Sequence, residues 1–159
     1  MNKPALIKKI IAQLTGELES FAKAARAAHA EATHESSKAE NKYDTRGLEA
    51  SYLAQGQSKQ AAEVAQAIED FQALPARTFA AGEGIEVGAL VELKSKSESA
   101  FYFVGPRAGG TEVRHEKTEV LVITPQSPLG QQLAGRKQGA QVKLQIAGAN
   151  SDFRIASVA

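Results

Sequence analysis

The chain has 159 residues and a formal net charge of +1, which is room for one ordinary domain or two small ones and gives no bulk attraction to nucleic acid. It has no cysteine, which excludes disulfides, thiolate catalysis and cysteine-based zinc sites. Its apolar runs are too short to span a membrane, and the N-terminus lacks the apolar core of a signal peptide. We therefore expect a soluble, cytoplasmic protein.

The first part of the chain predicts an antiparallel coiled-coil hairpin over residues 1–74. Seam residues alternate at spacings of four and three, the pattern of two packed helices. Going up they are Ile7, Ile11, Leu14, Leu18, Phe21, Ala25, Ala28 and Ala32, and coming back they are Ala50, Ala54, Gln57, Ala61, Val64, Ile68 and Phe71. Facing positions such as Ile11 and Phe71 sum to 82, which centres the turn near Asn41. The seam closes within one chain, so we expect a monomer with its tip near residues 38–46.

The seam changes in size along its length. Near the base it holds Ile, Leu, Phe and Val, whereas beyond Ala25 it is almost entirely alanine, with Gln57 opposite. Large apolar side chains stabilise a helix pair when they are buried, and alanine contributes much less. The pattern indicates a firm base and a thin distal shaft, although alanine is also simply a good helix former.

After the hairpin the sequence changes from alanine-rich helical segments to strand-like segments. Pro75 ends the second helix, and residues 75–84 read as a small, partly flexible linker. Residues 85–159 predict a β-rich domain, with His115 on a loop. The expected strands are Ile85–Lys94, Ser99–Val104, Thr118–Thr124, Ala140–Ala147 and Asp152–Val158, with one short helix at about Pro128 to Ala134. The predicted fold class is α+β, a helical hairpin followed by a compact β domain.

The predicted tip is polar and carries carboxylates. Asp44 is the first candidate to assist a metal-dependent reaction, followed by Glu40 and Glu49. Carboxylates on an apex hold Mg²⁺ weakly by themselves, so no metal held by this chain alone is expected. They become useful when a partner already holds one ion and lacks ligands for a second. The alternative is a solvated turn that is polar because it faces water.

Other tip residues are candidates for contact with a partner. Tyr43, Leu48 and Tyr52 fall off the seam, and Asn41 stands at the predicted turn. Exposed apolar and aromatic groups are typical anchors of protein interfaces. The alternative is that these side chains only pad the turn.

The β domain carries a motif that resembles a known family. Residues 124–144, TPQSPLGQQLAGRKQGAQVKL, are similar to the C-terminal signature of the bacterial Gre-type transcript cleavage factors GreA and GreB. The matching positions are Ser127, Pro128, Leu133, Gly135, Arg136, Gly139 and Val142. Upstream, the segment around Tyr102 to Gly105 resembles the family's second strand, and the preceding hairpin extends the resemblance to essentially the whole chain.

The resemblance implies a fold, a partner and a mechanism. The C-terminal domain would be FKBP-like and would dock at the rim of the secondary channel of bacterial RNA polymerase, here through Ser127, Pro128 and Leu129. The hairpin would thread the channel, where tip acids help to hold a second Mg²⁺ and the polymerase hydrolyses backtracked RNA. The factor would then need no cofactor of its own, would not be an enzyme itself, and would meet the RNA 3′ end only inside the polymerase.

The tip departs from the family pattern, which leaves the outcome open. The family's Asp-x-x-Glu and Asn-Ala-Glu-Tyr are absent, and aligning the tyrosine with Tyr52 places Thr45 and Leu48 where the acids would stand. Asp44 and Glu49 each lie one position away from these places, and one residue turns a helical side chain by about 100°. Their carboxylates could then miss the metal, and the hairpin could instead occupy the channel as an inhibitor or a competitor of Gre and DksA factors. A prolyl isomerase and a coiled-coil adaptor are more remote alternatives. A prolyl isomerase needs a pocket lined by aromatic rings, and the chain has no tryptophan to build one.

Overall fold

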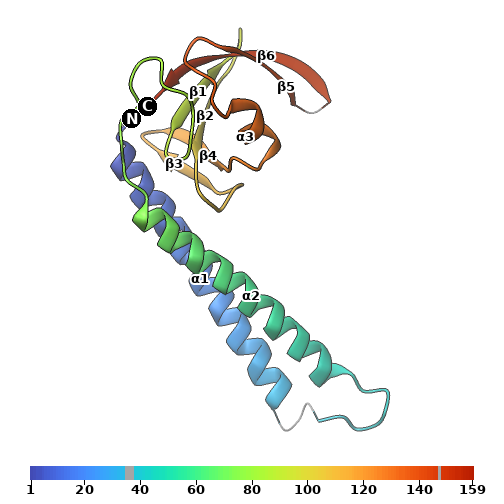
Figure 1. Ribbon diagram of the computed structural model, residues 1–159. Coiled ribbons are helices and arrows are strands. Elements are labelled where there is room, and N and C mark those ends of the chain that lie inside the picture. Colours follow the sequence, from blue (N-terminus) through green and yellow to red (C-terminus); the bar gives the residue numbers. More distant parts are fainter. Residues whose placement is uncertain (35–37, 147) are drawn as a thin grey trace. The chain divides into compact units, whose positions relative to one another are not determined.

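The computed structural model describes residues 1–34, 38–146 and 148–159, and these form two compact units. One unit comprises residues 12–69, and the other comprises residues 1–11 together with 70–159. Helix α1 spans Lys3–Thr33 and helix α2 spans Arg46–Ala73 (Figure 1). The predicted order, a helical hairpin followed by a β-rich part with one short helix, is confirmed. No described helix has the length and apolar character that a membrane span requires.

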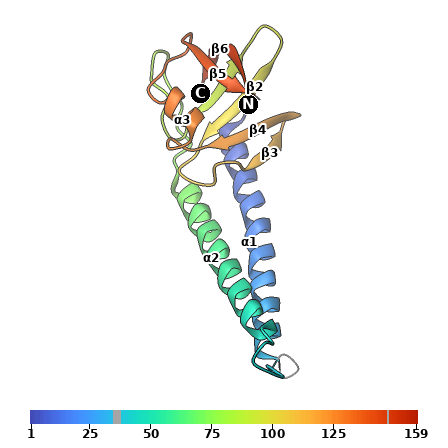
Figure 2. The same cartoon turned by 90° about the vertical axis from the view of Figure 1, so that its right-hand side faces the viewer.

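The unit of residues 12–69 is a pair of helices packed along the predicted seam. In two views α1 and α2 run side by side (Figures 1 and 2). Every predicted seam position in this unit is buried or half-buried, from Leu14 to Ala32 on α1 and from Ala50 to Ile68 on α2. The alternation of four and three therefore identified the contact face correctly, including Gln57, which is half-buried among alanines.

The second unit is built on a six-stranded sheet of order β3-β4-β2-β1-β6-β5. The strands are β1 (Leu90–Lys94), β2 (Ser99–Val104), β3 (Glu112–His115), β4 (Thr118–Ile123), β5 (Gln141–Ile146) and β6 (Ala149–Val158). Neighbours pair antiparallel except β2 and β4, which are parallel. Five of the strands were predicted; Ala147, the expected end of one, lies outside the described residues.

Strand β3 and its last residue correct the sequence prediction. His115 was expected on a loop, but it pairs with Thr118 and is 5% exposed. The two strands turn through Glu116 and Lys117, which both have positive φ values, 49° and 68°, as in the tight turns that favour hairpins. A four-residue strand with two charged side chains gives too short an alternation to be recognised by period.

One face of the sheet covers the main apolar core together with α3 (Pro128–Leu133). Leu93, Leu133 and Ile155 are completely buried there. Ser127 caps α3: its Oγ accepts a hydrogen bond from the Gly130 N–H at 3.0 Å and donates one to the Thr124 carbonyl at 2.7 Å. The cap fixes the turn between β4 and α3, because it satisfies an N–H group that a helix start leaves without a partner.

The ends of the two long helices belong to this same unit. Phe71 of α2 is fully buried, with its ring centroid 6.1 Å from that of Phe103 on β2. Leu6 and Ile10 of α1 are also fully buried, although neither lies on the predicted seam. They form a second apolar stripe on α1, and the helix base therefore contributes to the core of the β-rich unit.

Lys3 fastens the start of α1 to the segment that follows α2. Its Nζ donates hydrogen bonds to the carbonyls of Arg77 at 2.5 Å and Gly88 at 3.0 Å, and it lies 4.7 Å from the centroid of the Phe79 ring. Burial, together with the nearby Arg77 guanidinium, lowers the pKa of Lys3 to about 8. The segment predicted as a flexible linker is thus held by a buried ammonium group.

Candidate functional site

The apex of the hairpin is a loop whose turn is organised by Asn41. Its Oδ1 accepts a hydrogen bond from the Tyr43 N–H at 2.8 Å, and its carbonyl accepts one from the Asp44 N–H at 3.1 Å. Asparagine side chains favour such turns because they imitate a backbone acceptor. Asn41, predicted at the centre of the turn and as a contact residue, therefore has a clear local role in shaping the loop.

Asp44 is turned back onto its own loop. One carboxylate oxygen accepts the Glu40 N–H and the other accepts the Arg46 N–H, each at 3.3 Å, and the Arg46 guanidinium lies 3.5 Å away. The side chain is 13% exposed. These hydrogen bonds, the one from the Arg46 backbone above all, hold the pKa of the Asp44 carboxyl below its usual value. The carboxylate caps the start of α2 and offers little free oxygen to a metal.

The other two acids do not join Asp44 in a cluster. Glu49 accepts a hydrogen bond from the Thr45 hydroxyl at 3.0 Å, and its N–H bonds the Thr45 carbonyl at 2.9 Å, an arrangement that closes the first turn of α2. Glu40 is exposed. Within the described residues, no group of three or more acids and histidines is placed to hold a metal ion.

Exposed apolar side chains concentrate just after the apex. Tyr43 is 80%, Leu48 55%, Tyr52 65% and Leu53 56% exposed. Met1 is the one other large hydrophobic residue that is exposed in the described part of the chain. We call Tyr43, Leu48, Tyr52 and Leu53 the apex patch. Leu53 was not predicted as a contact residue; it flanks the seam position Ala54, and the seam pattern by itself does not show that it is exposed.

The three predicted docking residues lie at the start of α3. Ser127 is occupied by the cap, Pro128 is exposed and Leu129 is half-buried. Pro128 and Leu129 line a pocket of about 290 Å³ whose other walls include Tyr102 and Leu144. Burial raises the pKa of Tyr102, which keeps its hydroxyl neutral. The site is small, largely apolar and suited to a side chain of a partner.

The lowered pKa of the Asp44 carboxyl has a consequence that can be tested. Since its pKa is lowered on folding, the stabilisation of the cap is present above the unfolded value and is lost as the pH falls through the folded value. We expect the Arg46 and Glu40 amide resonances to shift together in acid, at a pH below the ordinary pKa of aspartate. An NMR titration measures this, with Asp44→Asn as the control that removes the transition. Independent titration of the two amides would contradict the geometry.

No protein-family model matches the chain, and no curated protein does. Among solved structures it is similar to GreA factor homolog 1 (Gfh1) of Thermus thermophilus, with 21% identity over 94% of each chain and a TM-score of 0.40. A structure of the transcription factor Gfh1 shares 23% identity over 96% of this chain and 92% of that one, with a TM-score of 0.41. Gfh1 of Thermus aquaticus shares 24% over 95% and 92%, with a TM-score of 0.40.

Proposed function

We propose that this protein binds bacterial RNA polymerase through the secondary channel and modulates transcription elongation. The observation that carries the proposal is the apex patch, four exposed apolar residues within positions 43–53 at one end of a helical hairpin. The exposure of clustered apolar side chains to water is unfavourable and often marks a surface that a partner covers. Aromatic side chains contribute much of the binding energy of many interfaces. The motif in residues 124–144 supports a polymerase as that partner.

The hairpin suits entry into a narrow channel. A helix of 31 residues such as α1 is about 46 Å long at 1.5 Å per residue. Beyond Ala25 the seam side chains are almost all alanine, so they add little bulk to the distal shaft. We infer that the distal hairpin enters the channel and that Pro128 and Leu129 contact the rim. The protein then acts without a catalytic centre of its own.

Two outcomes inside the channel remain distinct. A factor that aids RNA cleavage would supply carboxylates for the second Mg²⁺ of the polymerase. The engagement of Asp44 by two backbone N–H groups and Arg46 favours the other outcome. In that outcome the hairpin occupies the channel, without assisting cleavage, and competes with cleavage factors.

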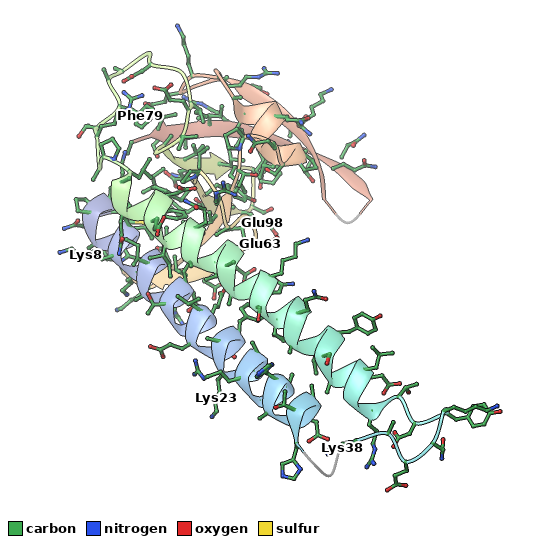
Figure 3. The ribbon with its side chains drawn as sticks, turned by 60° about the horizontal axis from the view of Figure 1, so that its bottom comes forward. Lys8, Lys23, Lys38, Glu63, Phe79 and Glu98 are labelled. Atoms are coloured by element: carbon green, nitrogen blue, oxygen red, sulfur yellow. The ribbon has the colours of Figure 1, made fainter. Side chains whose placement is uncertain are left out.

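The binding test compares wild type with a variant in which Tyr43, Leu48 and Tyr52 are replaced by alanine. We expect affinity for RNA polymerase core to fall by about tenfold or more, since each buried aromatic anchor contributes roughly 1–2 kcal/mol or more. Fluorescence anisotropy of labelled protein measures it. Glu63→Ala, on an exposed residue of α2 labelled in Figure 3, is the control and should bind as wild type. Absence of binding by the wild type at micromolar concentration would refute the proposal.

A second assay separates the two outcomes. Purified backtracked complexes are incubated with wild type or with Asp44→Asn, and the shortened RNA is measured. Channel occupancy predicts no faster cleavage by the wild type and slower cleavage when GreB is added afterwards. Faster cleavage that is lost in Asp44→Asn would assign the tip to the catalytic role instead.

A further inference from the structure

A groove of about 780 Å³ opens between α1 and α2 in the unit of residues 12–69. The residues that line it include the seam positions Ala25 and Ala54. Because these side chains end at Cβ, the space that leucine would fill in an ordinary helix pair is open to solvent. The hollow is broad and open to solvent along one side. Of the residues that line this hollow, the proposed polymerase contact uses Tyr52 alone.

The α1 wall of the groove carries a guanidinium and an imidazole. Arg26 and His29 lie one turn apart and both line it. No hydrogen bond or ion pair engages the Arg26 guanidinium within the described residues. No carboxylate is among the residues that line the groove, although this stretch of the chain, residues 12–69, is rich in glutamate. A free guanidinium with no acid beside it favours an anionic ligand, and phosphate above all, which it binds through two parallel N–H groups.

The α2 wall supplies neutral donors and a ring. Ser51, Gln55 and Ser58 recur at helical spacing along it, so that they face the same side of α2. Tyr52 follows Ser51, lines the same groove and is 65% exposed, so its ring is accessible for stacking. Aromatic rings bind planar heterocycles in this way irrespective of their exact substituents. Hydroxyl and amide groups then suit the sugar or the remaining phosphate oxygens.

We propose that this groove binds an organic phosphate that carries a planar ring, the chemistry of a nucleotide. Arg26 and His29 bind the phosphates, and Tyr52 stacks on the ring. The two proposals share Tyr52, but this inference does not depend on polymerase binding, because it is tested on the chain without the polymerase. Failure of one proposal therefore leaves the other intact.

The test is calorimetric titration of the full chain with ATP at low ionic strength and without Mg²⁺. Tripolyphosphate serves as the probe with phosphates only, and adenosine as the probe with a ring only. We expect ATP to bind at least about tenfold more tightly than either, and Arg26→Ala and Tyr52→Ala each to weaken it by about tenfold or more. Circular dichroism checks that the variants remain helical.

The matched control is Lys23→Ala. Lys23 is an exposed cation on the same helix, one turn before Arg26, and its side chain projects away from α2 (Figure 3). Its removal should leave the affinity for ATP unchanged. The proposal is overturned if ATP does not bind, if Lys23→Ala weakens binding as much as Arg26→Ala, or if tripolyphosphate binds as tightly as ATP and Tyr52→Ala has no effect.

Discussion

Gly130→Ala is expected to destabilise the β-rich unit by about 3 kcal/mol or more. A Cβ atom at this position would lie 1.8 Å from the Thr124 carbonyl oxygen and 2.9 Å from Ser127 Oγ. Neither neighbour can move freely, because the Ser127 hydroxyl itself bonds that carbonyl and the Gly130 N–H. The backbone between β4 and α3 must therefore shift, and the cap is lost. Urea unfolding followed by circular dichroism measures the loss.

The matched control is Gly16→Ala in α1. A Cβ there meets no atom within 4 Å, and alanine is favoured over glycine in a helix interior by about 1 kcal/mol. This substitution should raise stability slightly, so the pair of variants separates steric conflict from backbone entropy. A Gly130→Ala protein as stable as the wild type would show that the turn before α3 tolerates the added methyl group.

Phe71→Ala is expected to cost about 3–5 kcal/mol, the range for a buried phenylalanine replaced by alanine. The ring is fully buried, and its Cζ lies so near Gly105 that a Cβ there would approach it to 2.7 Å. Truncation leaves a cavity against Phe103 that the surrounding strands cannot close. A fall in the thermal midpoint, recorded at a near-ultraviolet wavelength that reports on aromatic packing, measures the effect.

The control for Phe71 is Leu53→Ala. Leu53 is 56% exposed on the same helix, and surface truncations usually change stability by no more than about 0.5 kcal/mol. Equal losses in the two variants would show that the destabilisation comes from the helix in general and not from the contact of Phe71 with the sheet.

The hairpin was predictable because periodicity reports directly on which residues are buried. The seam pairs the helices through positions such as Leu18 and Val64, which are half-buried as expected. Periodicity shows which face of a helix is apolar but not which other element packs against that face, so the burial of Leu6 and Ile10 was not predicted. These residues lie four apart on α1, and they are buried in the unit that residues 1–11 form with residues 70–159.

The candidate site was predictable in position but not in geometry. Charge and polarity placed Asp44 at the apex, and the departure from the seam placed Tyr43 and Tyr52 on the surface. The direction of the Asp44 carboxylate depends on two backbone N–H groups and one guanidinium. Sequence spacing does not reveal such short-range competition, because an acid near a helix start serves equally well as a cap or as a ligand.

The constant sum of the seam pairs has a consequence for how such a protein can vary. Facing residues add to 82, so inserting one heptad in α1 and one in α2 at the same level keeps every pair below it in register. The two insertions together lengthen the hairpin by about 10 Å. The contacts of Lys3, Phe71 and their neighbours stay unchanged, because residues 1–11 and 70–159 form their own unit. The reach of the hairpin can therefore evolve, or be engineered, as a separate quantity, without cost to the domain that carries it.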